Sequence, residues 1–92
     1  MSVSPLVLNN DLRMAHCGAL REQLVAALAQ KVPIVLDAHR VRFVDLATLQ
    51  VLLAFTRQAA KARRPVDWHD VSPVLRELSV STGVALGFGG SP

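Results

Sequence analysis

Apolar residues recur with helical spacing in the first third of the chain. Four of them follow the i, i+4, i+7, i+8 pattern of a single helix face: Leu20, Leu24, Ala27 and Leu28. Arg21, Glu22 and Lys31 fall on the other side of the same wheel. This spacing predicts an amphipathic helix over residues 17–31, which the following proline ends.

Two further helices are marked by the residues that begin them. Asp45 is a good N-cap, and residues 46–62 contain neither Gly nor Pro, so a long second helix is predicted there. Ser72 is an N-cap followed by Pro73 at the first helical position, which predicts a third helix through about residue 81. A glycine two residues later ends it.

Shorter apolar segments have the patterns of strands. Residues 34–36 form a continuous apolar run closed by Asp37, which is typical of a strand buried on both faces of a mostly parallel sheet. Residues 66–70 alternate, with Val66 and Trp68 on one face, as in a half-exposed strand.

The two ends of the chain carry weaker strand signals. Residues 4–8 and 12–14 flank the turn-forming Asn9-Asn10-Asp11, and this pattern predicts a small hairpin. Residues 84–86 are expected to add a last short strand. The connection between Asp37 and Asp45 is expected to pack its apolar members against the core: Val41, Phe43 and Val44.

The predicted order of elements is β-β-α-β-α-β-α, with the short strand at the end. Strands that alternate with helices indicate an α/β domain with right-handed crossovers. With 92 residues, 51% of them hydrophobic, the chain can bury one core but not form a two-lobed enzyme with a cleft between the lobes. We expect one domain over residues 1–92, with a core at about 5–86 and a flexible tail at 87–92.

Charge and composition narrow the function classes. The net charge of +3 comes with a basic run at the end of the second helix, where cations complement the helix dipole: Arg57, Lys61, Arg63 and Arg64. Only 4% of residues are aromatic, so the stacking platforms of nucleic-acid binders are nearly absent, and we expect no nucleic-acid partner.

The length of the charge-free stretches and the number of cysteines also indicate where in the cell the protein is found. The longest charge-free stretch, residues 78–92, is shorter than the roughly 18–20 apolar residues that span a bilayer, so no membrane insertion is expected. Residues 1–8 carry no basic region before an apolar stretch, which predicts no cleaved secretory signal. A single cysteine, Cys17, agrees with a reducing compartment, and the expected location is the cytoplasm.

The second helix has more apolar surface than one packed face needs. On a helical wheel its non-polar arc is roughly 200° wide, against about 100° for one face. One interpretation is a helix wedged between the sheet and neighbouring helices. The other is that the beginning of the helix, with Ala47, Gln50 and Ala54, is presented to a partner protein. The free N–H groups after Asp45 would also stabilise an anion or a phosphorylated side chain.

Most of the chain, from about residue 5 to 86, resembles the STAS domains, typified by bacterial anti-sigma factor antagonists. The matching stretches are Pro33-Ile-Val-Leu-Asp37, Val44-Asp45, Leu49-Gln-Val-Leu-Leu-Ala-Phe55, Pro65-Val-Asp-Trp68 and Ser72-Pro-Val-Leu75. The resemblance implies an α/β fold with a mixed, mostly parallel β-sheet and helices packed chiefly on one side. It also implies no enzymatic activity and regulated binding to a partner, commonly a serine-kinase anti-sigma factor.

The switch motif of that family departs from its usual form here. The family motif Asp-Ser-Ser/Thr-Gly corresponds to Asp45-Leu46-Ala47-Thr48. The phosphorylatable position is Ala47, which has no hydroxyl, and Thr48 replaces the glycine. The resemblance therefore implies that the ordinary phosphorylation switch is lost, with Thr48 as a weak candidate that is expected to bond to backbone or to pack inward.

The resulting hypothesis is a non-catalytic interaction module of bacterial signalling. Its partner-binding surface is expected to include Asp45, Leu46, Ala47, Thr48, Gln50, Val51, Ala54 and Arg57, with Arg42 and Gln58 adding to charge complementarity. The partner would be an anti-sigma kinase or a chemotaxis or two-component protein. The alternative that the resemblance leaves open is a STAS accessory subunit of a phospholipid-transport ATPase complex, which binds the ATPase subunit by the same surface.

Catalytic and metal-dependent alternatives are weaker. Cys17 and His16 are neighbours that do not face one another in a helix, and no acidic residue orients them, so a partly buried thiol is expected. Asp37, His39 and Asp45 could converge at the carboxyl end of the central strand, but their spacing specifies no ligand geometry. Gly87-Phe-Gly-Gly90 is not followed by a helix, which excludes a phosphate loop. We predict no cofactor, no metal and no catalytic residue.

Overall fold

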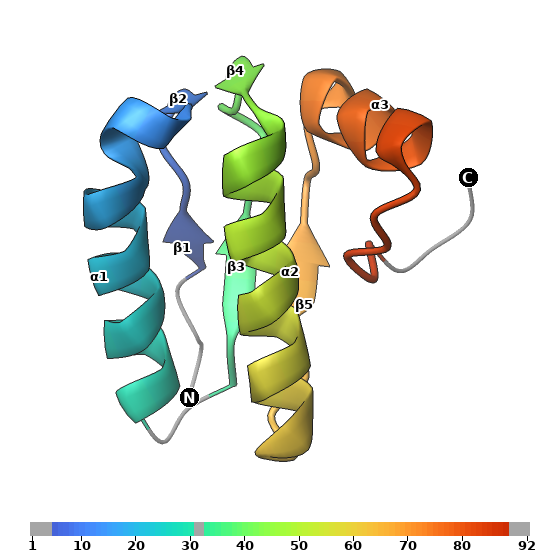
Figure 1. Ribbon diagram of the computed structural model, residues 1–92. Helices are drawn as coiled ribbons and strands as arrows, with labels where there is room; N and C mark the ends of the chain where they lie inside the picture. Colours follow the sequence, from blue (N-terminus) through green and yellow to red (C-terminus); the bar gives the residue numbers. More distant parts are fainter. Residues whose placement is uncertain (1–4, 31–32, 89–92) are drawn as a thin grey trace.

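The structure is a computed structural model that describes residues 5–30 and 33–88 (Figure 1). Strands and helices alternate along most of this part of the chain, as the apolar pattern predicts. In order, the elements are β1 (Leu6–Val7), β2 (Asp11–Leu12), the 3-10 helix η1 (Met14–His16), α1 (Cys17–Ala29), β3 (Val35–Asp37), β4 (Phe43–Val44), α2 (Leu46–Lys61), β5 (Asp67–His69) and α3 (Pro73–Thr82).

The strands form two small parallel sheets. One has the order β1-β3-β5, with Leu6 opposite Leu36 and Leu36 opposite Trp68. The other pairs β2 with β4, so that Asp11 lies opposite Phe43. Figure 1 shows α1 and α2 side by side over one face of β1 and β3. The predicted α/β fold with parallel strands and helices chiefly on one side is confirmed.

The hairpin predicted around Asn9-Asn10-Asp11 is wrong. Leu8 N donates to Asp37 O at 2.8 Å, whereas Arg42 N and Phe43 N donate to Asn10 O at 2.8 and 3.0 Å. The turn-forming residues carry the chain from one sheet to the other instead of reversing it. Each short strand then pairs in parallel with a later strand, and β4 forms within what the pattern indicates is only a connection.

The core lies between the three-stranded sheet and the two long helices. Leu36 of the central strand is fully buried, and Leu20 and Leu24 of α1 meet Leu49 and Leu52 of α2 in the same cluster. Burial of a leucine side chain contributes about 1.5–3 kcal/mol relative to exposure. The buried leucines of α1 and α2 are therefore the main source of the stability of the fold. The helix face predicted from Leu20 and Leu24 is confirmed.

The beginnings of α2 and α3 and the end of α3 are formed by the expected residues, whereas α1 ends at Ala29, before its predicted end at residue 31. Asp45 Oδ1 accepts from Thr48 N at 2.9 Å and begins α2. Ser72 Oγ accepts from Leu75 N at 3.3 Å, with Pro73 as the first residue of α3. Gly83 ends α3 in the left-handed conformation, with a φ of 72° that an L side chain rarely adopts.

The segment after α3 is ordered by Trp68 rather than by strand pairing. Residues 84–86 form no strand, so that expectation is wrong. Trp68 Nε1 donates to Leu86 O at 3.0 Å, and the Phe88 ring meets the Trp68 ring edge-on with centroids 4.9 Å apart. Arg76 of α3 stacks over the same Phe88 ring. Of the tail predicted at 87–92, residues 89–92 lie outside the described part of the chain.

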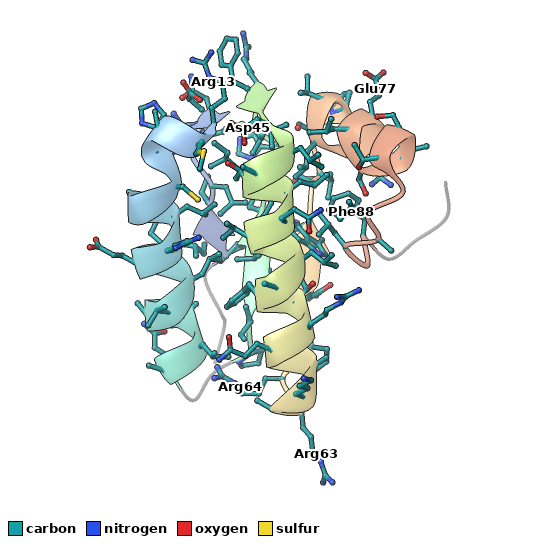
Figure 2. All side chains as sticks on the ribbon, viewed as in Figure 1. Arg13, Asp45, Arg63, Arg64, Glu77 and Phe88 are labelled. Carbon is teal, nitrogen blue, oxygen red and sulfur yellow. The ribbon has the colours of Figure 1, made fainter. Side chains whose placement is uncertain are left out.

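The two arginines that end the basic run after α2, Arg63 and Arg64, point in different directions. Arg64 donates from its guanidinium to Leu28 O and Ala27 O, at the carboxyl end of α1. Arg63 has a φ of 59° and extends away from the helices into solvent (Figure 2). One arginine of the pair therefore caps α1, where free carbonyls and the negative end of the dipole favour a cation.

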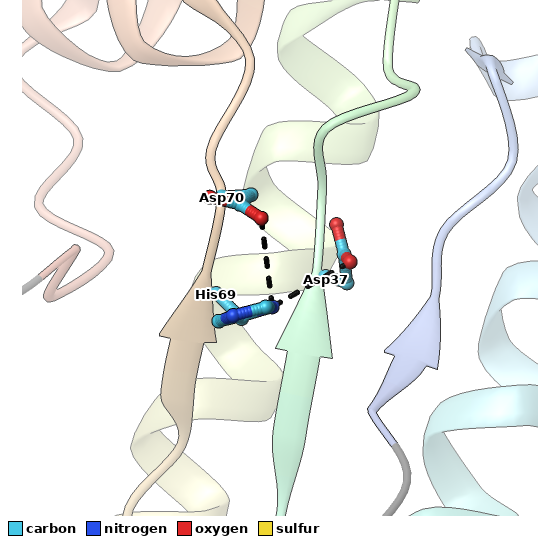
Figure 3. A group of neighbouring side chains, drawn as sticks. All are labelled: Asp37, His69 and Asp70. Carbon is cyan, nitrogen blue, oxygen red and sulfur yellow. Dashed lines mark ion pairs between the residues drawn. The ribbon is translucent and has the colours of Figure 1, made fainter.

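The second face of the three-stranded sheet carries polar residues at its carboxyl end. The parallel register places Val7 opposite Asp37 and Asp37 opposite His69. His69 is exposed, and Asp70 follows it directly at the end of β5 (Figure 3).

Within the described residues, no helix combines the length and the apolar character needed to cross a membrane.

Candidate functional site

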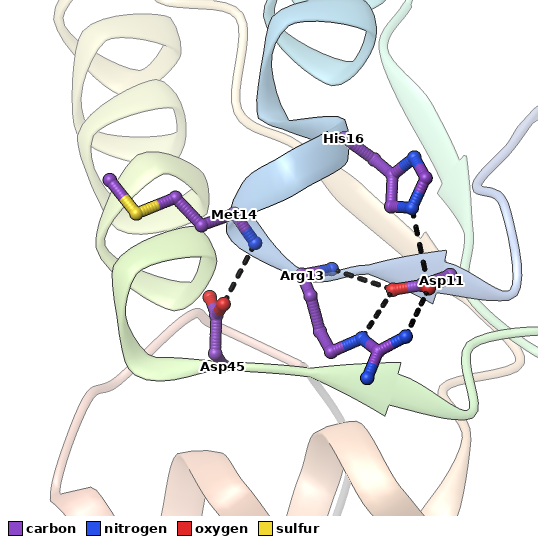
Figure 4. A network of polar contacts seen from close by, with 5 residues as sticks. All are labelled: Asp11, Arg13, Met14, His16 and Asp45. Atoms are coloured by element: carbon purple, nitrogen blue, oxygen red, sulfur yellow. Dashed lines mark hydrogen bonds and ion pairs between the residues drawn. The ribbon is translucent and has the colours of Figure 1, made fainter.

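The carboxylate of Asp45 caps two helices at once. Its Oδ1 accepts from Thr48 N in the first turn of α2, and its Oδ2 accepts from Met14 N, the first residue of η1, at 2.7 Å (Figure 4). The backbone of Asp45 is extended, with a φ of −121°, as an N-cap requires. The beginning of α2 is therefore joined to a segment that lies 31 residues earlier in the chain.

These two bonds also fix the charge of the site. The hydrogen bonds from the backbone of Thr48 and of Met14 lower the pKa of Asp45, and their effect exceeds the opposing effect of its partial burial. The carboxylate thus remains ionised and already occupies the positive end of the α2 dipole. The anion-binding position expected at the free N–H groups after Asp45 is filled by this side chain.

A second polar network holds η1 from the other side. Asp11 accepts from Arg13 N and Nε at 3.0 Å each and from the second guanidinium nitrogen at 2.7 Å, and His16 lies 3.4 Å from the same carboxylate (Figure 4). These bonds from Arg13 hold the pKa of Asp11 well below its usual range. The Arg13 guanidinium stacks 5.0 Å from the centre of the Phe43 ring. Together these contacts fix β4 and η1 around the start of α2.

The predicted partner-binding residues separate into an exposed and a buried set. Four exposed residues recur along one side of α2 and are called the α2 stripe below: Leu46, Gln50, Ala54 and Arg57. Ala47 and Val51 are half-buried beside it, and Asp45 is half-buried and committed to its two caps. Arg42 and Gln58 are exposed, as the interpretation of charge complementarity requires.

Thr48 does not belong to the surface. Its side chain is fully buried, and its Oγ1 has no hydrogen-bond partner among the described residues. Its inclusion among the partner-binding residues is therefore corrected: it occupies the third helical position, which turns the side chain into the core. The expectation that Thr48 packs inward is met. A hydroxyl in this position is inaccessible to a kinase in the folded protein.

Three surface residues at the same end were missed by the sequence reasoning. Met14, Phe43 and Val74 are 67%, 48% and 41% exposed, and Leu46 is 50% exposed. These four residues, called the apolar rim below, come from η1, β4, α2 and the beginning of α3, which meet at one end of the molecule (Figure 1). Phe43 was expected to pack against the core, where Val41 is in fact buried. Only the placement of η1 and β4 brings these residues together.

The predicted alternatives for catalysis and metal binding are not assembled as proposed. Cys17 is half-buried at the start of α1, while His16 is directed to Asp11 rather than to the thiol. His39 does approach Asp37, with Nδ1 2.6 Å from Oδ1, and its backbone N–H donates to the same oxygen. Asp45 does not join them, because both of its oxygens accept backbone N–H groups elsewhere.

Comparison with known proteins gives one match. The family model described as "Mlab, STAS domain" matches residues 2–85, which is nearly the whole chain. No curated protein matches the sequence, and no solved structure matches it either. The matched range includes every helix and strand described above, together with the α2 stripe and the apolar rim.

Proposed function

The chain belongs to the Mlab, STAS-domain family, and from this premise we propose that it is a non-catalytic protein–protein interaction module of bacterial signalling. Its docking surface consists of the α2 stripe and the apolar rim. The partner is a regulatory protein, such as an anti-sigma kinase or a chemotaxis or two-component protein. The proposed location is the cytoplasm, in agreement with the single unpaired Cys17.

The observation that carries the proposal is the position of the exposed apolar side chains. Seven large hydrophobic side chains are exposed among the described residues, and four of them form the apolar rim at the beginning of α2. Single exposed hydrophobic residues are common on any protein, but a group at one end marks an interaction site. The rim supplies the apolar anchors that the centre of a protein interface needs.

The frame behind these anchors is held by polar contacts within the chain. Asp45 holds η1 and α2 together, and the Asp11–Arg13 pair positions Phe43 through the stacked guanidinium. A preorganised surface loses less conformational entropy on binding than a mobile one does. The two polar networks therefore favour a fixed docking geometry at the beginning of α2.

The charges beside this surface are mainly basic. Arg42 lies directly before β4, and Arg57 ends the α2 stripe, and both side chains are exposed. An apolar partner surface bordered by carboxylates would complement this arrangement and would increase the rate of association.

We propose that docking is not controlled by phosphorylation of the usual position. Ala47 offers no hydroxyl, and phosphorylation of the buried Thr48 would place a charge near −2 inside the core. Incubation with a kinase and ATP is expected to leave Thr48 unmodified. Phosphate incorporated at Thr48 in the folded protein would contradict this part of the proposal.

The same surface suits the second candidate, an accessory subunit of a phospholipid-transport ATPase complex. The apolar rim suits a permanent contact with another subunit as well as it suits a regulated contact. Interfaces of permanent complexes are more hydrophobic than those of transient ones. Co-purification with a nucleotide-binding ATPase subunit would support this candidate. Co-purification with a kinase or a chemotaxis protein would support the first.

The test compares partner capture from native lysate by the wild type and by surface variants. Leu46→Asp and Ala54→Asp place a charge in the docking surface and are expected to abolish capture, and Gln50→Glu is expected to weaken it. Val25→Asp is the matched control, because Val25 is exposed on α1 outside this surface. A partner set that survives both Leu46→Asp and Ala54→Asp unchanged would refute the proposed surface.

A further inference from the structure

The carboxyl ends of β3 and β5 bring together side chains that the docking surface does not use. Parallel register sets Asp37 opposite His69 on the sheet face that α1 and α2 leave uncovered, and Asp70 follows at the end of β5 (Figure 3). One donor atom from each of the three residues lies within 4.8 Å of the others. Among the described residues, no other such group of His, Cys, Asp or Glu donors is found.

We propose that Asp37, His69 and Asp70 form a binding site for a divalent transition-metal ion, with Zn²⁺ as the best-suited ion. Imidazole nitrogen and carboxylate oxygen together are the donors that zinc accepts. Three protein donors would leave a further coordination position for water or for an oxygen donor of another molecule.

The distances between the donors support this assignment. His69 Nδ1 lies 3.6 Å from Asp37 Oδ2 and 3.7 Å from Asp70 Oδ2. Ligands held at about 2.0–2.2 Å from a tetrahedral zinc ion are themselves separated by about 3.3–3.6 Å. Two of the three donor pairs thus stand close to the spacing of a first coordination shell, and the third pair lies within 4.8 Å. His69 and Asp70 are exposed, so small rotations of their side chains can complete the approach.

His39 orients the least mobile of the three ligands. Its backbone N–H and its ring both bond to Asp37 Oδ1, at 2.9 and 2.6 Å, which leaves Oδ2 directed toward His69. Outer-shell hydrogen bonds of this kind fix the orientation of a metal-binding carboxylate.

The experiment is a calorimetric titration of Zn²⁺ into tag-free, chelator-treated protein at neutral pH. We expect saturable binding of one ion per chain. His69→Ala and Asp70→Asn are each expected to weaken binding at least about 10-fold, and His39→Ala about 10–100-fold. His16→Ala is the matched control, because His16 is similarly exposed but lies beside one aspartate, Asp11, instead of two. It is expected to bind as the wild type does.

Two further measurements keep the result interpretable. Circular dichroism verifies that each variant is folded. If His69→Ala does not fold, Asp70→Asn alone tests the metal site, because the Asp70 side chain is exposed and its replacement is not expected to unfold the protein. In NMR spectra of the histidine rings, Zn²⁺ is expected to shift His69 and leave His16 unchanged. The proposal is overturned if no saturable binding occurs, if His69→Ala and Asp70→Asn bind as tightly as the wild type, or if His16→Ala weakens binding equally.

Discussion

Asp45 and Met14 are 31 residues apart in the chain, yet Asp45 Oδ2 accepts a 2.7 Å hydrogen bond from Met14 N. The other oxygen of the same carboxylate caps α2. One side chain therefore satisfies free N–H groups at the ends of two helices and sets the position of one relative to the other. The apolar rim depends on this arrangement, because Met14 and Leu46 belong to the two helices that Asp45 joins.

Removal of the Asp45 carboxylate is expected to destabilise the protein. Asp45→Ala leaves two backbone N–H groups without their acceptor, and the expected loss in the free energy of unfolding is about 1–3 kcal/mol. Asp45→Asn keeps one acceptor oxygen, so its loss should be smaller. Urea denaturation measures both. Asp67→Ala, at an exposed aspartate of β5, is the control and should change the free energy by less than about 0.5 kcal/mol. Equal stability of Asp45→Ala and the control would contradict the double cap.

The lowered pKa of Asp45 has a consequence for acid stability. The unfolded chain binds the proton first, near the ordinary aspartate pKa of about 3.9, whereas the folded protein binds it only at lower pH. The stabilisation from Asp45 is thus complete above about pH 5, about one unit above the unfolded-state pKa. It is lost as the pH falls toward the folded-state pKa. The melting temperature of Asp45→Asn, measured from pH 7 to pH 3, should fall less than that of the wild type. Parallel curves would show that Asp45 does not contribute to the acid sensitivity.

The buried hydroxyl of Thr48 is expected to be dispensable. Its Oγ1 is removed from water without a hydrogen-bond partner, which costs free energy that a methyl group of similar size does not cost. Thr48→Val should leave the free energy of unfolding unchanged or raise it by up to about 1 kcal/mol. Thermal and urea unfolding provide the measurement. A loss greater than about 1 kcal/mol would reveal a hydroxyl that is needed in the folded state.

Two glycines should respond to alanine with opposite signs. Gly83 has a φ of 72°, and since a Cβ there would meet no atom within 4 Å, the cost of Gly83→Ala is backbone strain of about 1–2 kcal/mol. Gly18 lies in α1 with equally open space around it. Gly18→Ala is therefore expected to stabilise by about 0.5–1 kcal/mol. Each variant serves as the control for the other in denaturant unfolding. A change of the same sign in the free energy of unfolding of both variants would contradict this account.

The helices were predictable because their signals are local. Asp45, Ser72 and Gly83 mark helix ends through their own side chains or backbone freedom, and the structure confirms all three. The run at 34–36 likewise identifies the central strand, although the predicted burial on both faces is not met, because Val35 is only half-buried. These features depend on residues that are at most four positions apart.

The parts that were missed depend on distant segments. β2 and β4 have two residues each, too few for a periodic pattern, and they exist because Asp11 and Phe43 meet through the folding of the whole chain. The proximity of Asp37 and His69 likewise follows from the register of β3 and β5 and not from their spacing in sequence. The exposure of Phe43 is a consequence of the same pairing, which turns its ring toward Arg13.

The most direct test of the docking surface is site-specific photo-crosslinking in cells. A photoreactive residue placed at Leu46 or at Phe43 samples the apolar rim, and the same residue at Val25 or Val80 samples exposed positions of other helix surfaces. The account predicts one discrete adduct, with the same partner protein, from positions 46 and 43 and none from 25 and 80. Absence of an adduct at 46 and 43, or the same adduct from all four positions, would contradict it.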